Sequence, residues 1–160
     1  MHESVFNWAR DFVLKHDLLY VTPVLEVGSC NVNGSVRVLF NKMGYTGVDI
    51  APGPGVDLVI EPNTLPFPDS SYKVVVSTEM LEHAEYPIRI LSEMHRVLKK
   101  DGVLLLSTRS KGFEHHNAPD YHRFSRAEMA VMLLELGFDR ISVTCDPQAP
   151  GVFASAFKPV

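Results

Sequence analysis

The chain of 160 residues has little of several features that mark particular classes of protein. Its two cysteines, Cys30 and Cys145, are not in a CxxC pair, which argues against a zinc or redox motif and favours reduced thiols in the cytoplasm. No apolar run approaches the length of a membrane span, and early charges interrupt any signal-peptide core. With 15 basic against 19 acidic residues and a net charge of −4, a general nucleic-acid binder is not expected.

What the sequence does contain is a series of short apolar runs separated by polar loops. Their length and composition predict seven strands, at Val24–Gly28, Tyr45–Ile50, Asp57–Ile60, Lys73–Thr78, Val103–Ser107, Ile141–Cys145 and Val152–Phe157. The last two are joined by a Pro- and Gly-containing turn, which predicts an antiparallel hairpin at one edge of the sheet.

Helical spacing and capping residues predict the helices between these strands. Ser4 caps a first helix, and a further helix runs through Val36 and Phe40. Pro87 begins a helix that extends to Lys100, and a capping box at Ser125 begins the last one. The Pro- and Gly-rich loop 51–56 leaves no room for the usual helix after the second strand.

Together these elements predict one α/β domain over residues 1–160, with an N-terminal helix in 1–21 and a core in 22–160. The core is a Rossmann-like, doubly wound sheet of seven strands in a compact form. Ligands of such sheets bind beyond the carboxyl ends of the strands, at the point where the strand order reverses.

Gly28 ends the first strand and Asp49 follows about twenty residues later, near the end of the second. A carboxylate in this position can accept hydrogen bonds from two ribose hydroxyls. A turn aspartate is the plain alternative. The next glycine after Gly28 is Gly34, so the glycine-rich phosphate loop of nicotinamide enzymes is missing and a nicotinamide-dependent oxidoreductase is disfavoured.

Six segments in order resemble the class I S-adenosylmethionine-dependent methyltransferases, especially the type 11 group. They are VLEVGS at 24–29, GVD at 47–49, LPFPD at 65–69, EMLEH at 79–83, RVLKKDG at 96–102 and DYHRFS at 120–125. The resemblance covers roughly residues 22–160 and implies S-adenosylmethionine as cofactor. The chain departs from the family pattern in its reduced glycine loop and in the missing helix.

The resemblance implies a set of cofactor-binding residues. Glu26 orients the loop after the first strand, Asp49 holds the ribose, Glu61 faces the adenine and Glu79 lies near the sulfonium. The full set is Glu26, Gly28, Ser29, Asn33, Asp49, Ile50, Glu61, Pro62, Thr78 and Glu79. Purely structural roles stay open, Glu26 as a loop cap and Asn33 as a turn residue among them.

A general base is needed only where the acceptor loses a proton, and His83 and His116 are the candidates. Packing under the loop is the alternative for His83. His115, His116 and Tyr121 are candidates for contact with the acceptor. The spacing of these histidines fits no standard metal site, and no metal is expected.

The sequence therefore predicts a methyltransferase that acts on an oxygen, nitrogen or carbon of an unidentified acceptor, a small molecule or a glycan among the candidates. A non-catalytic, methyltransferase-like binding protein is the alternative. No membrane or strong nucleic-acid signal is present, and a homodimer in which a second copy closes the site stays open.

Overall fold

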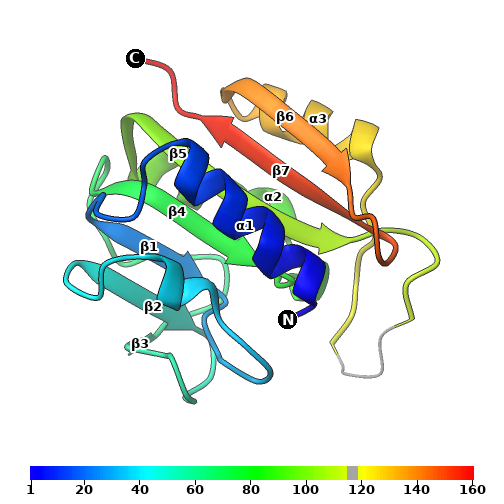
Figure 1. The fold of residues 1–160 in the computed structure, drawn as a ribbon, viewed down its shortest axis with the longest axis horizontal. Helices are drawn as coiled ribbons and strands as arrows, with labels where there is room; N and C mark the ends of the chain where they lie inside the picture. The colour runs from blue at the N-terminus through cyan, green and yellow to red at the C-terminus, as the bar shows by residue number, and fades with distance from the viewer. Residues whose placement is uncertain (115–118) are drawn as a thin grey trace.

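The computed structural model describes residues 1–114 and 119–160. At the centre of this part is a seven-stranded sheet in the order β3-β2-β1-β4-β5-β7-β6 (Figure 1). Its strands are β1 (Val24–Val27), β2 (Tyr45–Asp49), β3 (Leu58–Val59), β4 (Tyr72–Thr78), β5 (Leu98–Arg109), β6 (Asp139–Cys145) and β7 (Gly151–Phe157). The pairs among β1 to β5 are parallel, and β7 is antiparallel to β5 and β6. The predicted doubly wound sheet with an antiparallel hairpin is confirmed.

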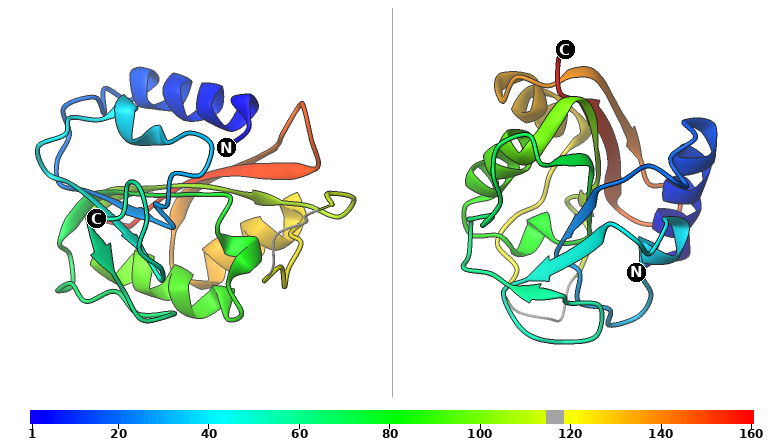
Figure 2. Two further views of the ribbon diagram at one scale, coloured as in Figure 1. Left: turned by 90° about the horizontal axis from the view of Figure 1, so that it is seen from below. Right: turned by 90° about the vertical axis from the view of Figure 1, so that its left-hand side faces the viewer.

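Helices cover both faces of this sheet (Figure 2). The helix α1 (Glu3–Lys15) and the 3-10 turn η1 (Val36–Leu39) lie on one face, and α2 (Pro87–Val97) and α3 (Arg126–Glu135) lie on the other. Because side chains alternate along a strand, each central strand contributes side chains to the hydrophobic cores on both faces of the sheet. Leu25 packs with α2 and α3, whereas its neighbour Val24 packs with α1.

The crossover between β2 and β3 is a loop without a helix, as the sequence predicts. The loop folds back over β2, where Arg37 donates to the Gly55 carbonyl at 3.3 Å and pairs with Asp57 at 2.9 Å. A Cβ at Gly47 would lie 2.4 Å from that carbonyl oxygen, so a side chain at 47 would push the loop away. The loop thereby covers part of the sheet in place of the missing helix.

Several predicted boundaries are wrong. His2 is the cap position of α1, and Ser4 lies inside the helix with its buried hydroxyl donating to Asp146. The helix predicted after β1 is one 3-10 turn. α2 ends at Val97 rather than Lys100, because Leu98 is already extended and pairs with β4. The capping box at Ser125 is confirmed.

Candidate functional site

Gly28 and Asp49 meet at the carboxyl ends of β1 and β2. The N–H groups of Gly28 and Ser29 donate to the Val48 carbonyl at 2.9 and 3.0 Å. Gly28 has a φ of 81°, which glycine adopts without strain, and a Cβ there would lie 2.4 Å from Cγ of Met80. The chain thus turns sharply after β1, closely packed against the segment that follows β4.

The carboxylate of Asp49 is half-buried and held by two backbone donors. Cys30 N–H donates to Oδ2 at 3.1 Å and Ile50 N–H donates to Oδ1 at 2.8 Å. Because each carboxylate oxygen has about two acceptor positions, both oxygens keep one for a ligand. The side chain is therefore oriented in advance for two neighbouring hydroxyl donors.

Other predicted cofactor residues lie around this edge. Glu61 and Pro62 are exposed just after β3, and Ile60 N–H donates to the Asp49 carbonyl at 2.9 Å. Thr78 is the half-buried last residue of β4, and Asn33 is exposed in the loop after β1. The sheet thus brings residues from four separate segments to one edge.

Glu26 and Ser29 face inward. Glu26 is buried and accepts a hydrogen bond from the Tyr45 hydroxyl at 2.7 Å. Burial raises the pKa of Glu26 to about 7, against the lowering effect of that hydrogen bond. The Ser29 hydroxyl is buried beside Gly47, without a hydrogen-bond partner among the described residues. Their roles in cofactor binding stay predictions.

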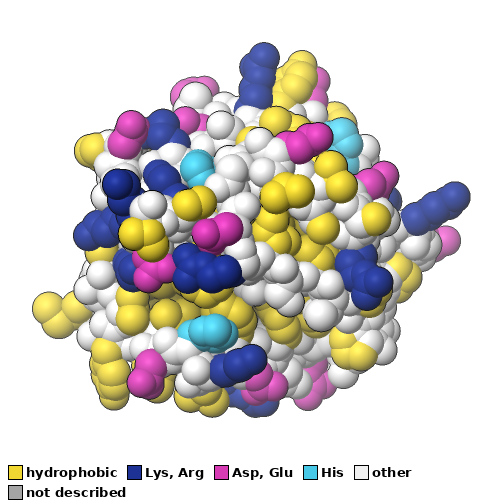
Figure 3. Space-filling model, turned by 90° about the horizontal axis from the view of Figure 1, so that it is seen from above, with side chains coloured by type: hydrophobic (Ala, Val, Ile, Leu, Met, Phe, Trp, Pro, Cys, Tyr) yellow, Lys and Arg dark blue, Asp and Glu magenta, His cyan; other side chains and the backbone are white. Residues whose placement is uncertain are grey.

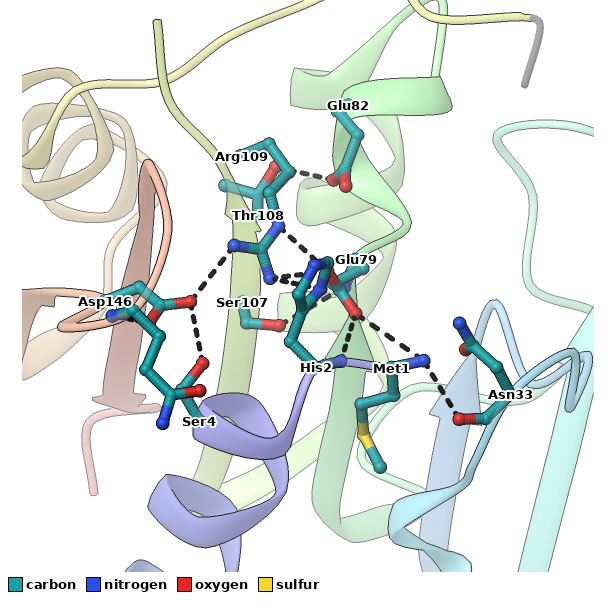
Figure 4. Close-up of polar contacts among 11 residues, drawn as sticks. Met1, His2, Ser4, Asn33, Glu79, Glu82, Ser107, Thr108, Arg109 and Asp146 are labelled. Carbon is teal, nitrogen blue, oxygen red and sulfur yellow. Dashed lines mark hydrogen bonds and ion pairs between the residues drawn. The ribbon is translucent and has the colours of Figure 1, made fainter. Parts of the chain in front are cut away.

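Glu79 follows β4 and is the centre of a charged network (Figure 4). Its φ of 50° is unusual for a residue with a side chain, and its N–H donates to the Ser107 carbonyl at 2.9 Å. Arg109 Nε donates to Glu79 Oε1 at 2.8 Å, and His2 Nδ1 lies 2.6 Å from the same oxygen. Burial alone raises the pKa of Glu79, but Arg109 and His2 outweigh it and lower the pKa.

The other end of Arg109 reaches the turn between β6 and β7. Its Nη1 donates to Asp146 Oδ2 at 3.0 Å, and both side chains are fully buried. Ser4 also donates to that oxygen at 3.0 Å, so α1, β5 and the β6–β7 turn are linked. Burial by itself raises the pKa of Asp146. Its hydrogen bonds and the charge of Arg109 outweigh burial, so that the net pKa is lowered. The guanidinium lies over Phe113, 4.7 Å from the ring centre.

The 3-10 turn η2 (Leu81–His83) holds the segment 119–124. The Glu82 carbonyl accepts the Tyr121 N–H at 2.9 Å, and His83 Nδ1 contacts the Pro119 carbonyl. The Glu82 side chain is buried and accepts the Thr108 hydroxyl at 2.7 Å. Burial raises the pKa of Glu82. His83 thus takes part in packing this segment against η2, and its role as a base stays a prediction.

Tyr121 is exposed, whereas His115 and His116 lie outside the described residues. Arg123 braces Asp120 through a bidentate ion pair. Among residues 1–114 and 119–160 no group of three or more His, Cys, Asp or Glu could hold a metal ion. None of the helices in those ranges is long and apolar enough to cross a lipid bilayer.

On the face shown in Figure 3, Lys and Arg side chains are interspersed with Asp and Glu and with apolar groups. No continuous basic surface is visible on that face. This agrees with the acidic composition of the chain.

His2 and Arg109 are residues of this network that the sequence does not predict. Arg109 ends β5 beside the end of β4, and a charge that closes a long apolar strand is a signal that points to the same edge as Glu79. His2 gives no such signal, because α1 is folded back over the sheet by tertiary packing.

The methyltransferase domain family matches residues 25–106, just over half of the chain. The 2-methyl-6-phytyl-1,4-hydroquinone methyltransferase of Synechocystis sp. is 34% identical over 101 residues, which are 54% of this chain and 31% of that protein. The match thus spans about a third of the length of this curated relative.

Solved structures share the fold at low identity. The 1,6-didemethyltoxoflavin-N1-methyltransferase of Burkholderia thailandensis, solved with S-adenosylhomocysteine, has a TM-score of 0.76 at 19% identity, covering 99% of this chain and 80% of that one. A SAM-dependent methyltransferase of Aquifex aeolicus has a TM-score of 0.68 at 20% identity, and the match covers 92% of this chain and 88% of that one. The [4+2]-cyclase SpnF has a TM-score of 0.75 at 16% identity, and the match covers 96% of this chain and 82% of that one. A shared fold therefore does not by itself fix the reaction.

Proposed function

Because the chain belongs to the methyltransferase domain family, we propose that it binds S-adenosylmethionine at the carboxyl ends of β1, β2 and β4 and transfers the methyl group to an acceptor. The methyltransferase domain family and the doubly wound fold predicted from the sequence are confirmed. The observation that carries the proposed site is the meeting of Gly28 and Asp49 at the strand-order reversal.

The donor and acceptor groups at this edge fit the cofactor. Asp49 offers two oriented oxygens to a ribose diol, and the exposed Glu61 offers a carboxylate to an adenine amino group. Gly28 leaves the backbone after β1 without a side chain, which suits close approach of an amino-acid tail. The other residues of the proposed set are Glu26, Ser29, Asn33, Ile50, Pro62, Thr78 and Glu79.

When bound, S-adenosylmethionine supplies a methyl group already activated by its sulfonium. The chain's own residues then have to orient the two reactants and keep water out. Asp49 fixes the ribose, and Glu79, directly after β4, lies beside the proposed reacting centre with its charge balanced by Arg109. Where the acceptor loses a proton, His83 and His116 are the proposed bases and Tyr121 a proposed contact.

Calorimetric titration with S-adenosylhomocysteine tests this proposal. Asp49→Ala removes both ribose acceptors and is expected to weaken binding by about 10- to 100-fold, since hydrogen bonds to charged groups contribute roughly 1.5–3 kcal/mol. Asp49→Asn keeps one acceptor oxygen, and its affinity is expected to lie between those of the wild type and Asp49→Ala. Asp11→Ala, an exposed site on α1, is the control. Absence of binding by the wild type, or equal binding by Asp49→Ala, contradicts the proposal.

A binding protein without turnover is the second candidate. It is favoured by Glu79, whose carboxylate is already paired with Arg109 and His2. Incubation with labelled S-adenosylmethionine and a panel of phenols, amines and glycans separates the two. Label transfer to any acceptor supports the methyltransferase, and cofactor binding without transfer supports the second candidate.

The acceptor class and the setting of the protein are also proposals. We propose a small molecule or a glycan as acceptor, with a second copy of the chain available to close the exposed site. The free thiols Cys30 and Cys145 support a reducing cytoplasm.

A further inference from the structure

The two residues before α1, Met1 and His2, lie across the gap between the loop after β1 and the end of β4 (Figure 4). We call them the lead segment. The nitrogen of Met1 donates to the Asn33 carbonyl at 3.2 Å, and the N–H of His2 donates to Glu79 Oε2 at 3.2 Å. The lead segment therefore bridges two separate parts of the carboxyl edge.

Both anchors belong to the proposed cofactor site. The side chain of Met1 also lies at this loop, with its Cε 3.5 Å from the position of a Cβ at Gly34. The lead segment thus already contacts groups proposed to face the sulfonium and the amino-acid end of the cofactor.

The lead segment occupies the carboxylate oxygen of Glu79 that Arg109 does not contact. A carboxylate has about four acceptor positions. Arg109 donates to Oε1 through Nε and Nη2 and the His2 imidazole contacts the same oxygen, whereas Oε2 accepts the His2 N–H and has the nitrogen of Met1 at 4.0 Å. A donor or cation of a ligand that pairs with Oε2 therefore takes the place that the lead segment now holds.

Of Arg109 and His2, His2 is the one able to leave Glu79. The Arg109 side chain is fully buried and also holds Asp146, so its release leaves buried charges unpaired. The side chain of His2 is 43% exposed, and its imidazole regains water when it moves away.

We infer that the lead segment competes with the methionine part of S-adenosylmethionine, its sulfonium and amino-acid end, for Glu79 and Asn33, so that cofactor binding displaces His2. The inference rests on the proposed function. It makes the lead segment an inhibitory contact: the measured dissociation constant is the intrinsic one divided by the fraction of molecules in which the segment is open.

Calorimetry with S-adenosylhomocysteine on the full chain tests this inference. His2→Ala is expected to tighten binding by about 3- to 10-fold, because it raises the open fraction. Arg10→Ala is the matched control, since Arg10 lies on α1 and its ion pair is with Asp11. Thermal unfolding of each variant verifies that it is folded.

Unchanged or weaker binding by His2→Ala, with normal binding by the wild type, overturns the inference alone. Absence of binding by the wild type and by every variant overturns the proposed function and the inference with it. Hydrogen exchange gives a second measurement. The N–H of His2 is expected to exchange faster when S-adenosylhomocysteine is added, and slower exchange contradicts displacement.

Discussion

At the scale of single residues, Glu26 is an acid inside an otherwise apolar strand. Its partner Tyr45 donates to it, and burial raises the pKa of Glu26 to about 7 from an ordinary 4.5. The protonated form therefore stabilises the folded chain. This contribution is fully present below about pH 4.5 and is lost as the pH rises through about 7.

We expect Glu26→Gln to remove this pH dependence. A shift of this size corresponds to at most about 3 kcal/mol. Between about pH 5 and pH 8 the unfolding free energy of the wild type should fall by up to about 3 kcal/mol more than that of Glu26→Gln. Urea unfolding at the two pH values measures this difference. Glu135→Gln, at an exposed site, controls for the lost charge. Equal pH dependence in wild type and Glu26→Gln refutes this account of Glu26.

Arg109 is the residue on which the buried network depends. Arg109→Met leaves Glu79 and Asp146 without their common partner and is expected to cost about 3–5 kcal/mol in unfolding free energy. Arg140→Met breaks exposed ion pairs and should cost at most about 1 kcal/mol. Urea unfolding measures both values, and equal costs argue against a stabilising buried network.

The position of a residue along the chain predicts that Asp49 lies at the candidate site, but it does not predict this for Arg109 or His2. Asp49 follows from the end of an apolar run and its distance from Gly28, which are both local features. The partners of Glu79 come from β5 and from the residues before α1, 30 and 77 positions away. Such pairs follow from tertiary packing, which a single sequence does not display.

At the scale of elements, the start of α3 is the clearest local signal. Ser125 and Glu128 form a reciprocal capping box. Ser125→Ala is expected to lower stability by about 1 kcal/mol, since it leaves a helix N–H unpaired. Ser92→Ala, exposed inside α2, should be neutral or slightly stabilising because alanine favours helix. Thermal unfolding compares the two, and equal effects contradict a capping role.

The ends of the other elements depend on pairing that the sequence does not display. β5 begins at Leu98, because that residue pairs with Tyr72 of β4, whereas the apolar run itself starts at Val103. Helical spacing around Val36–Leu39 predicts a helix, but the structure has only the 3-10 turn η1 there, because the chain becomes extended again at Phe40. Periodicity therefore predicts which elements exist, and tertiary pairing sets their bounds.

At the scale of the whole molecule, the order of the strands places the site. β1 and β4 are neighbours although β2 and β3 lie between them in sequence, so the chain reverses direction across the sheet at β1. The segments after β1, β2 and β4 then meet at one edge, which is where Gly28, Asp49 and Glu79 lie. The strand pattern and the family motifs predict this convergence, whereas the lead segment that covers part of it follows from the fold of α1.

The most direct test of the central claim is a crystal structure of the chain with S-adenosylhomocysteine. We expect both ribose hydroxyls within hydrogen-bond distance of the Asp49 carboxylate, and the amino-acid end beside Gly28. Ligand density elsewhere, such as in the aromatic groove lined by Trp8 and Phe153 between α1 and β7, with no ligand at Asp49, would contradict it.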